Sequence, residues 1–209
     1  ASLDVENETV VQQALSRLLA GKVFNPPARV NVREHYGIDR DALVVGHVGR
    51  FVSEKNQAFL VEVVSRLRSE GVRAEALLLG DGPLRDKVSS KADSLGISQY
   101  VHFAGIQDDT ASHYSAMDVF CMPSLFEGLP VSCVEAQASG LPMVLSAGIS
   151  HMADICGHTA FLKLDESASS WGNAIRAAAD GGRHNGTSAL RAAGYDIATA
   201  AQEFERLYL

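Results

Sequence analysis

Short apolar runs alternate with helix-length segments through the middle of this 209-residue chain, and that alternation limits the folds that it can adopt. Strands are predicted near residues 43–49, 74–80, 100–104, 118–123, 142–146 and 159–164, with helices between them. Turn signals separate the segments, among them Gly-Asp-Gly-Pro at 80–83 and Leu-Gly-Ile at 95–97. Strands that alternate with helices form a parallel sheet covered on both faces. The sequence therefore predicts an α/β, Rossmann-like domain of three layers, with a parallel sheet of about six strands and helices at both termini.

The segment 124–144, SLFEGLPVSCVEAQASGLPMV, is the most informative for function. Pro130 fits the first turn of a helix and Gly140 fits the position just past its end. Glu127 then lies in the turn before the helix, and Glu135 lies about a turn and a half inside it. Free backbone N–H groups and the positive end of the helix dipole lie between the two carboxylates. A ligand with hydroxyl groups at both ends and an anion in the middle, such as a nucleotide-sugar, fits this arrangement.

Two glutamates near a helix start are more often solvated surface charges than ligand-binding groups. Glu127 differs because it precedes a Gly-Leu-Pro turn at the carboxyl end of a strand, where open α/β sheets bind ligands. Glu135 is less clear. Its neighbours Val131, Val134 and Ala138 indicate a buried helix, and a carboxylate on such a helix needs a partner or a ligand.

A second candidate site lies at residues 43–56, LVVGHVGRFVSEKN, where an apolar run ends in Gly49. Glycine allows the backbone to turn sharply there. Arg50 and Lys55 are then expected to project from a loop above the edge of the sheet. Arginine offers a bidentate fork to phosphate and lysine a compact charge, although a solvated basic pair beside Glu54 would give the same pattern.

Together these segments resemble the C-terminal, nucleotide-sugar-binding half of GT-B glycosyltransferases, specifically the retaining family whose signature is E-x7-E. Glu127 and Glu135 match that signature, and GRFVSEKN matches the family's phosphate loop. Three further segments match in order, namely LLLGDGP at 77–83, VHFAG at 101–105 and AMDVF at 116–120. The resemblance covers about residues 38–209 and is greatest to bacterial exopolysaccharide and capsule glycosyltransferases.

The resemblance implies a role for each matching residue. Arg50 and Lys55 would neutralise the donor pyrophosphate and support its departure, and Glu127 would bind hydroxyls of the transferred sugar. These three are the expected catalytic residues, although neither glutamate transfers a proton. Glu135 would bind the ribose hydroxyls. The remaining expected contacts to the donor are mostly backbone, from Gly49, Gly105, Ile106, Gly128, Leu129 and Val131.

The resemblance also implies that no metal or other cofactor is required, because the basic pair takes the place of a metal. The donor is an NDP-sugar, and UDP is expected only because it is frequent in the family. Base contacts made by backbone leave no side-chain signature in the sequence.

A complete enzyme of this family has two Rossmann-like halves, and 209 residues accommodate one half plus about 40 residues. Residues 1–40 are expected to form a helical segment and linker: a helix near 8–20, a proline-containing linker at 25–27 and a short polar helix that ends near Gly37. Residues 41–195 would form the nucleotide-sugar-binding domain, and 196–209 a C-terminal helix. We therefore expect that the acceptor half is not part of these 209 residues, and that this chain alone binds the donor and is catalytically incomplete.

The expected function is transfer of a hexose from an NDP-sugar to a glycan or lipid-linked acceptor in polysaccharide biosynthesis. A missing N-terminal half or a partner chain would bind the acceptor. Three alternatives remain open: a non-catalytic nucleotide-sugar-binding module, one subunit of a split glycosyltransferase, and a related GT-B reaction such as nucleotide-sugar epimerisation.

Composition excludes several other classes. The formal net charge of −7 argues against a nucleic-acid partner, and no apolar run approaches the length needed to span a membrane. Asp4, Glu6 and Glu8 are wrong for the basic leader of a signal peptide. We expect a cytoplasmic protein, with peripheral association at the inner face of the membrane open to the complete enzyme.

Three cysteines without CxxC spacing argue against both a disulfide framework and a zinc site, and we expect Cys121 and Cys133 to be buried. The seven histidines show no metal-ligand spacing. His47 lies inside a predicted strand and is expected in the core. His151 follows a loop that would face the cleft, so an active-site role and a purely structural one both remain open.

Overall fold

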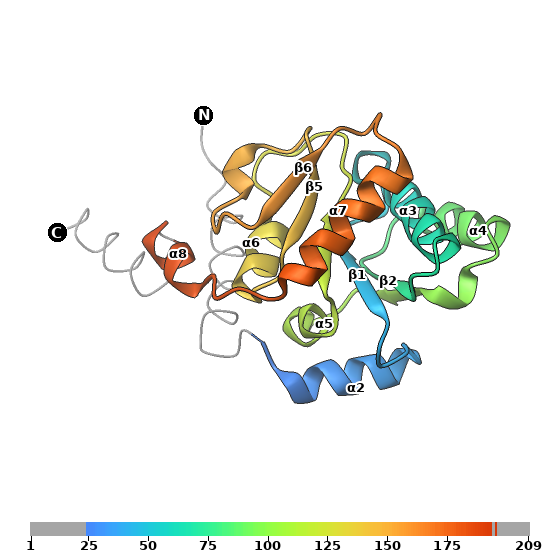
Figure 1. The fold of residues 1–209 in the computed structure, drawn as a ribbon, viewed down its shortest axis with the longest axis horizontal. Helices are drawn as coiled ribbons and strands as arrows, with labels where there is room; N and C mark the ends of the chain where they lie inside the picture. Colours follow the sequence, from blue (N-terminus) through green and yellow to red (C-terminus); the bar gives the residue numbers. More distant parts are fainter. Residues whose placement is uncertain (1–23, 194, 196–209) are drawn as a thin grey trace.

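The computed structural model describes residues 24–193 and 195, and within them six strands form one parallel sheet (Figure 1). The strand order is β3-β2-β1-β4-β5-β6, and all five pairings are parallel. The strands are β1 (Leu43–Val48), β2 (Ala74–Leu79), β3 (Val101–Gly105), β4 (Val119–Met122), β5 (Met143–Ser146) and β6 (Thr159–Leu162). The expected Rossmann-like α/β domain is confirmed, and each predicted strand lies within two residues of its observed bounds.

Helices cover both faces of the sheet. Helices α3, α4 and α7 pack over one hydrophobic cluster, and α2, α5 and α6 contribute to a second cluster. The α-helices are α2 (Pro26–Tyr36), α3 (Gln57–Ser69), α4 (Arg85–Ser94), α5 (Thr110–Ala116), α6 (Val131–Ala138), α7 (Ala168–Gly181) and α8 (Thr187–Ala192), and three short 3₁₀ helices are η1 (Ser53–Lys55), η2 (Ser98–Tyr100) and η3 (His151–Ala153). Of the helices in this described part of the chain, none has both the length and the apolar character that a membrane crossing requires.

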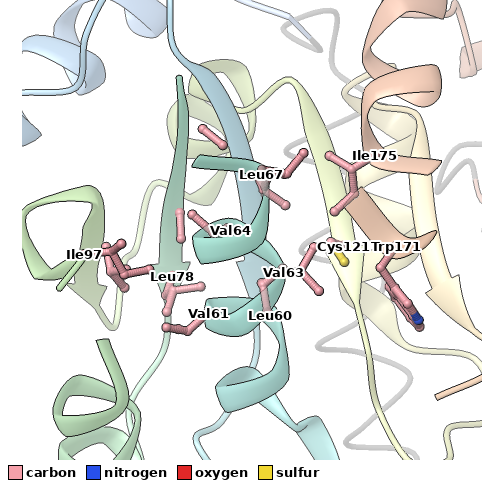
Figure 2. Close-up of a cluster of buried hydrophobic side chains, with 14 of the residues drawn as sticks. Leu60, Val61, Val63, Val64, Leu67, Leu78, Ile97, Cys121, Trp171 and Ile175 are labelled. Atoms are coloured by element: carbon pink, nitrogen blue, oxygen red, sulfur yellow. The ribbon is translucent and has the colours of Figure 1, made fainter. Parts of the chain in front are cut away.

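Successive strand residues divide between the two clusters because side chains alternate across a sheet. Val45 and Leu78 belong to the first cluster, whereas Val44 and Leu77 belong to the second. Figure 2 shows the first cluster, in which the apolar face of α3 meets β2, β4 and Trp171 of α7. The central strands β1, β2, β4 and β5 are largely buried on both faces, and such strands are expected to be mostly apolar, which is why the sequence predicted them.

The proline-containing linker expected at 25–27 is instead the start of a helix. The Asn25 side chain accepts a hydrogen bond from the Ala28 N–H and caps α2, and Pro26 and Pro27 occupy its first turn. Proline is tolerated there because the N–H groups of a first turn have no partner within the helix. The predicted end of the helix near Gly37 is confirmed. The helix predicted near 8–20 and the C-terminal helix at 196–209 lie outside the described residues.

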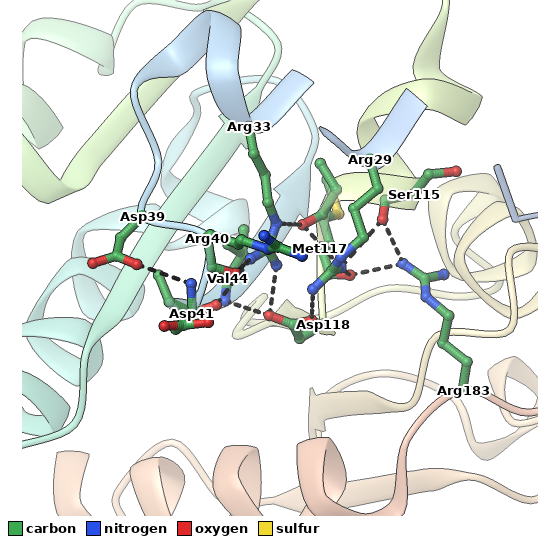
Figure 3. A network of polar contacts seen from close by, with 12 residues as sticks. Arg29, Arg33, Asp39, Arg40, Asp41, Val44, Ser115, Met117, Asp118 and Arg183 are labelled. Carbon is green, nitrogen blue, oxygen red and sulfur yellow. Dashed lines mark hydrogen bonds and ion pairs between the residues drawn. The ribbon is translucent and has the colours of Figure 1, made fainter. Parts of the chain in front are cut away.

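Helix α2 is attached to the domain by a network of arginines (Figure 3). Asp118, just before β4, forms ion pairs with Arg29 at 2.7 Å and with Arg33 at 2.8 Å, and accepts a hydrogen bond from the Val44 N–H. Arg183 donates to the carbonyl oxygens of Tyr114, Ser115, Met117 and Ser139, and its burial lowers the pKa of its guanidinium to about 10. The network holds the amino ends of β1 and β4 together. It thereby helps to position these two strands and the loops that follow their carboxyl ends.

Candidate functional site

The strand order places a topological switch point between β1 and β4. From β1 the chain continues to β2 and β3 on one side, and β4 then pairs with the other side of β1. The loops that follow the two strands, residues 49–56 and 123–130, therefore leave the same edge of the sheet in different directions. Open parallel sheets bind ligands in the crevice that forms at such a point. Both candidate segments from the sequence meet there.

The two loops are joined by one hydrogen bond and one ion pair. The Leu125 N–H donates to the carbonyl oxygen of Glu54 at 2.7 Å. Lys55 Nζ lies 2.6 Å from Glu127 Oε1, and the two side chains are 19% and 22% exposed. The sequence identified both residues but not their pairing. An anion that binds Lys55 must therefore compete with the Glu127 carboxylate.

The Glu127 backbone is held in place by the loop after β5. Its N–H donates to the Gly148 carbonyl, and its own carbonyl accepts from the Ser150 N–H. These bonds form an isolated parallel bridge between Glu127 and Ile149. A side chain at Gly148 would overlap the Leu125 carbonyl oxygen, so the close approach of the two loops requires glycine there. The carboxylate of Glu127 thus rests on a fixed backbone.

Among the residues that the structure describes, no side chain caps the N-terminus of helix α6. Pro130 is the N-cap residue, one position before the place that the sequence suggested, and Val131 is the first helical residue. Gly128 and Leu129 lie exposed in the turn before it. The first N–H groups of a helix have no partner within the helix, and its dipole favours an anion at that end. These amides lie next in the chain to Glu127, which pairs with Lys55.

Glu135 lies one turn inside α6 and is 9% exposed. The Tyr114 hydroxyl donates a hydrogen bond of 2.8 Å to its Oε2 atom. Burial raises the pKa of Glu135, and the hydrogen bond from Tyr114 opposes that rise. The sequence predicted that this carboxylate needs a partner, but it did not identify Tyr114.

A groove of about 500 Å³ continues the site along the carboxyl ends of β1 and β2. Its lining comes from three segments: Val48, Gly49 and Arg50 after β1, Leu79–Gly82 after β2, and Ile106, Gln107 and Thr110 after β3. Arg50 is exposed, and the Ile106 side chain is 80% exposed. Gly105 accepts a hydrogen bond from the Gly80 N–H at 2.7 Å. The sequence predicted Gly49, Arg50 and Ile106 as contacts to the donor. It identified 80–83 as a turn within a segment that matches the family, but it did not assign that turn to the site.

The two singled-out histidines have different surroundings. His47 is fully buried as predicted, its Nδ1–H donates to the Cys121 carbonyl at 3.0 Å, and burial lowers its pKa to about 4. It is therefore neutral near pH 7. The ring of His151 is exposed and stacks on Phe161 at 4.1 Å. A role for His151 in the site stays a prediction.

The three cysteines are free, and Cys121 and Cys133 are buried as expected. Across residues 24–193 and 195, His, Cys, Asp and Glu side chains form no group of three that could hold a metal ion. The charged residues that the sequence predicted for the site lie at the switch point: Arg50 lines the groove, Lys55 pairs with Glu127, and Glu135 lies one turn inside α6.

Comparison with known families gives one matching model, described as "Glycosyl transferases group 1", over residues 42–180. The match begins just before β1 and ends within α7, so it includes the whole sheet and both glutamates.

Two bacterial proteins are among the most similar relatives. EpsF of Bacillus subtilis, described as a putative glycosyltransferase, is 42% identical over 148 residues, which are 70% of this chain and 38% of EpsF. LpsE of Rhizobium meliloti, a lipopolysaccharide core biosynthesis glycosyltransferase, is 46% identical over 104 residues, 50% of this chain and 29% of LpsE. The chain therefore matches well under half the length of these relatives.

Solved structures show the same fold. The crystal structure of HepE from Anabaena in complex with UDP and glucose superimposes with a TM-score of 0.74, at 21% identity, over 88% of this chain and 52% of that one. At this identity the likeness shows the architecture, which is the Rossmann-like half of a GT-B arrangement.

Proposed function

This chain belongs to the group 1 glycosyl transferases, and from that membership we propose that it is the donor-binding half of a retaining glycosyltransferase of polysaccharide biosynthesis. The complete enzyme transfers a hexose from an NDP-sugar, most simply a UDP-sugar, to a glycan or lipid-linked acceptor. The observation that carries the proposal is the meeting of Lys55, Glu127 and the uncapped N-terminus of α6 at the switch point, beside an open groove. HepE, which was crystallised with UDP and glucose on the same fold, supports the choice of donor.

The pyrophosphate is assigned to the centre of the site. Arg50 and Lys55 supply the positive charge from one side, and the backbone amides of Gly128, Leu129 and Val131 supply donors from the other. Negative charge grows on the leaving diphosphate as the bond to the sugar breaks. Fixed cations and amides aimed at that charge stabilise the transition state without reorganising. For this reason we expect donor binding to need no divalent metal.

The two ends of the donor are assigned to the two glutamates and the groove. Glu127, once released from Lys55, accepts hydrogen bonds from hydroxyls of the transferred sugar. Glu135 accepts from the ribose, and the base lies in the groove against Gly49, Gly105 and Ile106. Both carboxylates position the donor and neither moves a proton.

The acceptor is assigned to a second Rossmann-like half that faces this edge of the sheet. That half comes either from the same longer chain or from a partner polypeptide. We propose a cytoplasmic location, with the complete enzyme working at the inner face of the membrane where lipid-linked acceptors lie.

Calorimetric titration with UDP, GDP, UDP-glucose and UDP-N-acetylglucosamine tests the function. We expect saturable binding of a uridine nucleotide at micromolar to millimolar Kd, unchanged by EDTA, and weakened about 10-fold or more in Arg50→Ala, as loss of a charged hydrogen bond implies. Failure of every nucleotide to bind the folded chain would contradict the proposal. Binding that requires Mg²⁺ would contradict only the metal-independent part.

Substitution of Gly80 by alanine is expected to damage the groove. Gly80 has φ of 117°, and a side chain there would overlap the Gly49 carbonyl oxygen, displacing the backbone that carries Arg50. We expect a loss of about 1–3 kcal/mol in the free energy of unfolding, as for strained backbone, together with weaker UDP binding. Urea unfolding and calorimetry measure the two effects.

Gly96→Ala is the matched control, because Gly96 also has a positive φ of 68° but no atom within 4 Å of the added side chain. It should lose stability from backbone strain alone and keep its UDP affinity. Equal UDP affinity in the two variants would show that the Gly49–Gly80 contact does not shape the site.

A further inference from the structure

Tyr114 is a fully buried side chain that links the sheet core to Glu135 of the candidate site. It lies on α5, and its ring packs against Phe120 of β4 with centroids 6.1 Å apart. Its hydroxyl reaches Glu135 on α6, 21 residues away in sequence. A buried aromatic ring with two rotatable bonds holds its hydroxyl in one place.

The Tyr114 hydroxyl donates a hydrogen bond to the Glu135 carboxylate and stays protonated. Burial raises the pKa of Tyr114 well above its ordinary value, and the charge of Glu135 raises it further. The phenol is therefore neutral near pH 7. Oε2 of Glu135, at 2.8 Å, is the nearer of the two acceptors of this hydroxyl, the other being the Ser132 carbonyl oxygen at 3.3 Å.

The other oxygen of Glu135 has a different environment. Oε1 of Glu135 forms no hydrogen bond with any of the described residues. It is also not one of the fully buried polar atoms that lack a partner, so it keeps some contact with solvent. A carboxylate oxygen can accept more than one hydrogen bond. Because Oε2 is fixed by Tyr114, the direction of Oε1 is fixed as well.

We propose that Tyr114 is a positioning residue for the nucleotide, which holds one oxygen of Glu135 so that the other accepts hydrogen bonds from the ribose hydroxyls of a nucleoside diphosphate. The inference rests on the proposed function, because it takes the ligand from there. It adds a residue outside the E-x7-E segment to the binding apparatus. Tyr114 acts through Glu135 and does not itself touch the ligand.

Two nucleotides, one with and one without ribose hydroxyls, distinguish a positioning role of Tyr114 from a merely structural one. UDP and 2′,3′-dideoxy-UDP are titrated into the wild type and Tyr114→Phe. We expect the variant to bind UDP about three- to tenfold more weakly, as loss of a hydrogen bond to a charged group implies. The dideoxy nucleotide should bind both proteins within about twofold, since it has no ribose hydroxyls for Glu135 to accept.

The matched control is Tyr36→Phe. Tyr36 also packs beside α5, and its substitution likewise removes a single hydroxyl. In the wild type that hydroxyl contacts His113 Nε2 at 3.3 Å and does not reach Glu135. Its affinity for both nucleotides should be that of the wild type. The double variant Tyr114→Phe with Glu135→Gln should bind UDP no more weakly than Glu135→Gln alone, because the two residues act as one unit.

A pH series gives a second readout. The Tyr114 hydrogen bond lowers the pKa of Glu135, so its loss should raise that pKa further above the ordinary value. A protonated carboxyl accepts ribose hydrogen bonds poorly. As pH falls, Tyr114→Phe should therefore lose UDP affinity at a higher pH than the wild type, and the dideoxy nucleotide should show no such difference.

Equal weakening of both nucleotides in Tyr114→Phe, or no weakening of either, would overturn the inference while leaving the proposed function intact. Absence of UDP binding by the wild type would instead overturn the proposed function, and this inference with it. Urea unfolding checks that the variant is folded. If it is not, Tyr114→Met refills the site with a flexible apolar side chain, and the same ligand pair decides.

Discussion

Replacing Asp118 by alanine is expected to lower the free energy of unfolding by about 3–5 kcal/mol, the cost of leaving the buried Arg33 charge without its ion-pair partner. The substitution removes the partner of Arg33, whose side chain is 5% exposed, and of Arg29. It also leaves the Val44 N–H at the start of β1 without its acceptor. Burial lowers the pKa of Arg33, yet a guanidinium stays charged and cannot escape the cost by losing a proton.

Urea unfolding followed by circular dichroism measures this loss. Asp86→Ala is the matched control, because the Asp86 side chain is 97% exposed and lies 3.8 Å from Arg85. Exposed pairs contribute about 0–1 kcal/mol, so that variant should unfold almost as the wild type does. A loss below about 1 kcal/mol in Asp118→Ala would show that the arginine network does not hold α2 on the sheet.

Substitutions of the two members of the Lys55–Glu127 pair are expected to change UDP affinity in opposite directions. Lys55→Ala removes a cation assigned to the pyrophosphate and should weaken UDP binding by about 1.5–3 kcal/mol, or about 10- to 150-fold. Glu127→Gln removes the carboxylate that lies 2.6 Å from Lys55 and competes with the phosphate. It should strengthen UDP binding about two- to fivefold, on the scale of a partly exposed ion pair.

Comparing UDP with UDP-glucose tests the role assigned to Glu127. Glu127 is assigned to hydroxyls of the transferred sugar, so Glu127→Gln should not strengthen binding of UDP-glucose as it does binding of UDP. Lys55→Ala should also cost more in the Glu127→Gln background, where Lys55 is free to bind phosphate. Calorimetry with UDP and UDP-glucose on the wild type, the two single variants and the double variant gives the binding free energies of this double-mutant cycle.

Glu62→Gln is the control for this pair. Glu62 also lies 2.6 Å from a lysine, Lys91, but the two belong to the outer helices α3 and α4. Its substitution should leave the affinity for both ligands unchanged. If Glu127→Gln weakens UDP binding, Glu127 is not a competitor of the phosphate and the assignment of Lys55 is wrong.

The central strands β1, β2, β4 and β5 were predictable because they are largely buried on both faces and are therefore mostly apolar. The edge strands β3 and β6 are only partly buried, and they were predicted as short apolar runs between turn signals. The start of α2 was not, because Pro26 and Pro27 are strong breakers inside a helix and are tolerated only in its first turn. A proline pair alone does not reveal on which side of the boundary it lies. Asn25 was the available signal, since a capping side chain followed by proline is typical of a helix start.

The sequence identified the candidate residues but not their partners. Lys55 and Glu127 lie 72 positions apart, and they meet only because β4 pairs with β1 and not with β3. The Tyr114–Glu135 hydrogen bond depends in the same way on the packing of α5 and α6 against one face of the sheet. Gly80 was read as a turn residue, and its contact with Gly49 appears only when β1 and β2 lie side by side. Long-range pairings of this kind follow from topology, which local patterns do not specify.

A crystal structure of this chain with UDP bound tests the central claim most directly. We expect the pyrophosphate within hydrogen-bond distance of Arg50, Lys55 and the amides at the start of α6, with the ribose on Glu135 and the base in the groove beside Ile106. Lys55 should then have left Glu127. A nucleotide bound elsewhere on the surface, or one bound while the Lys55–Glu127 pair stays closed, would contradict the account.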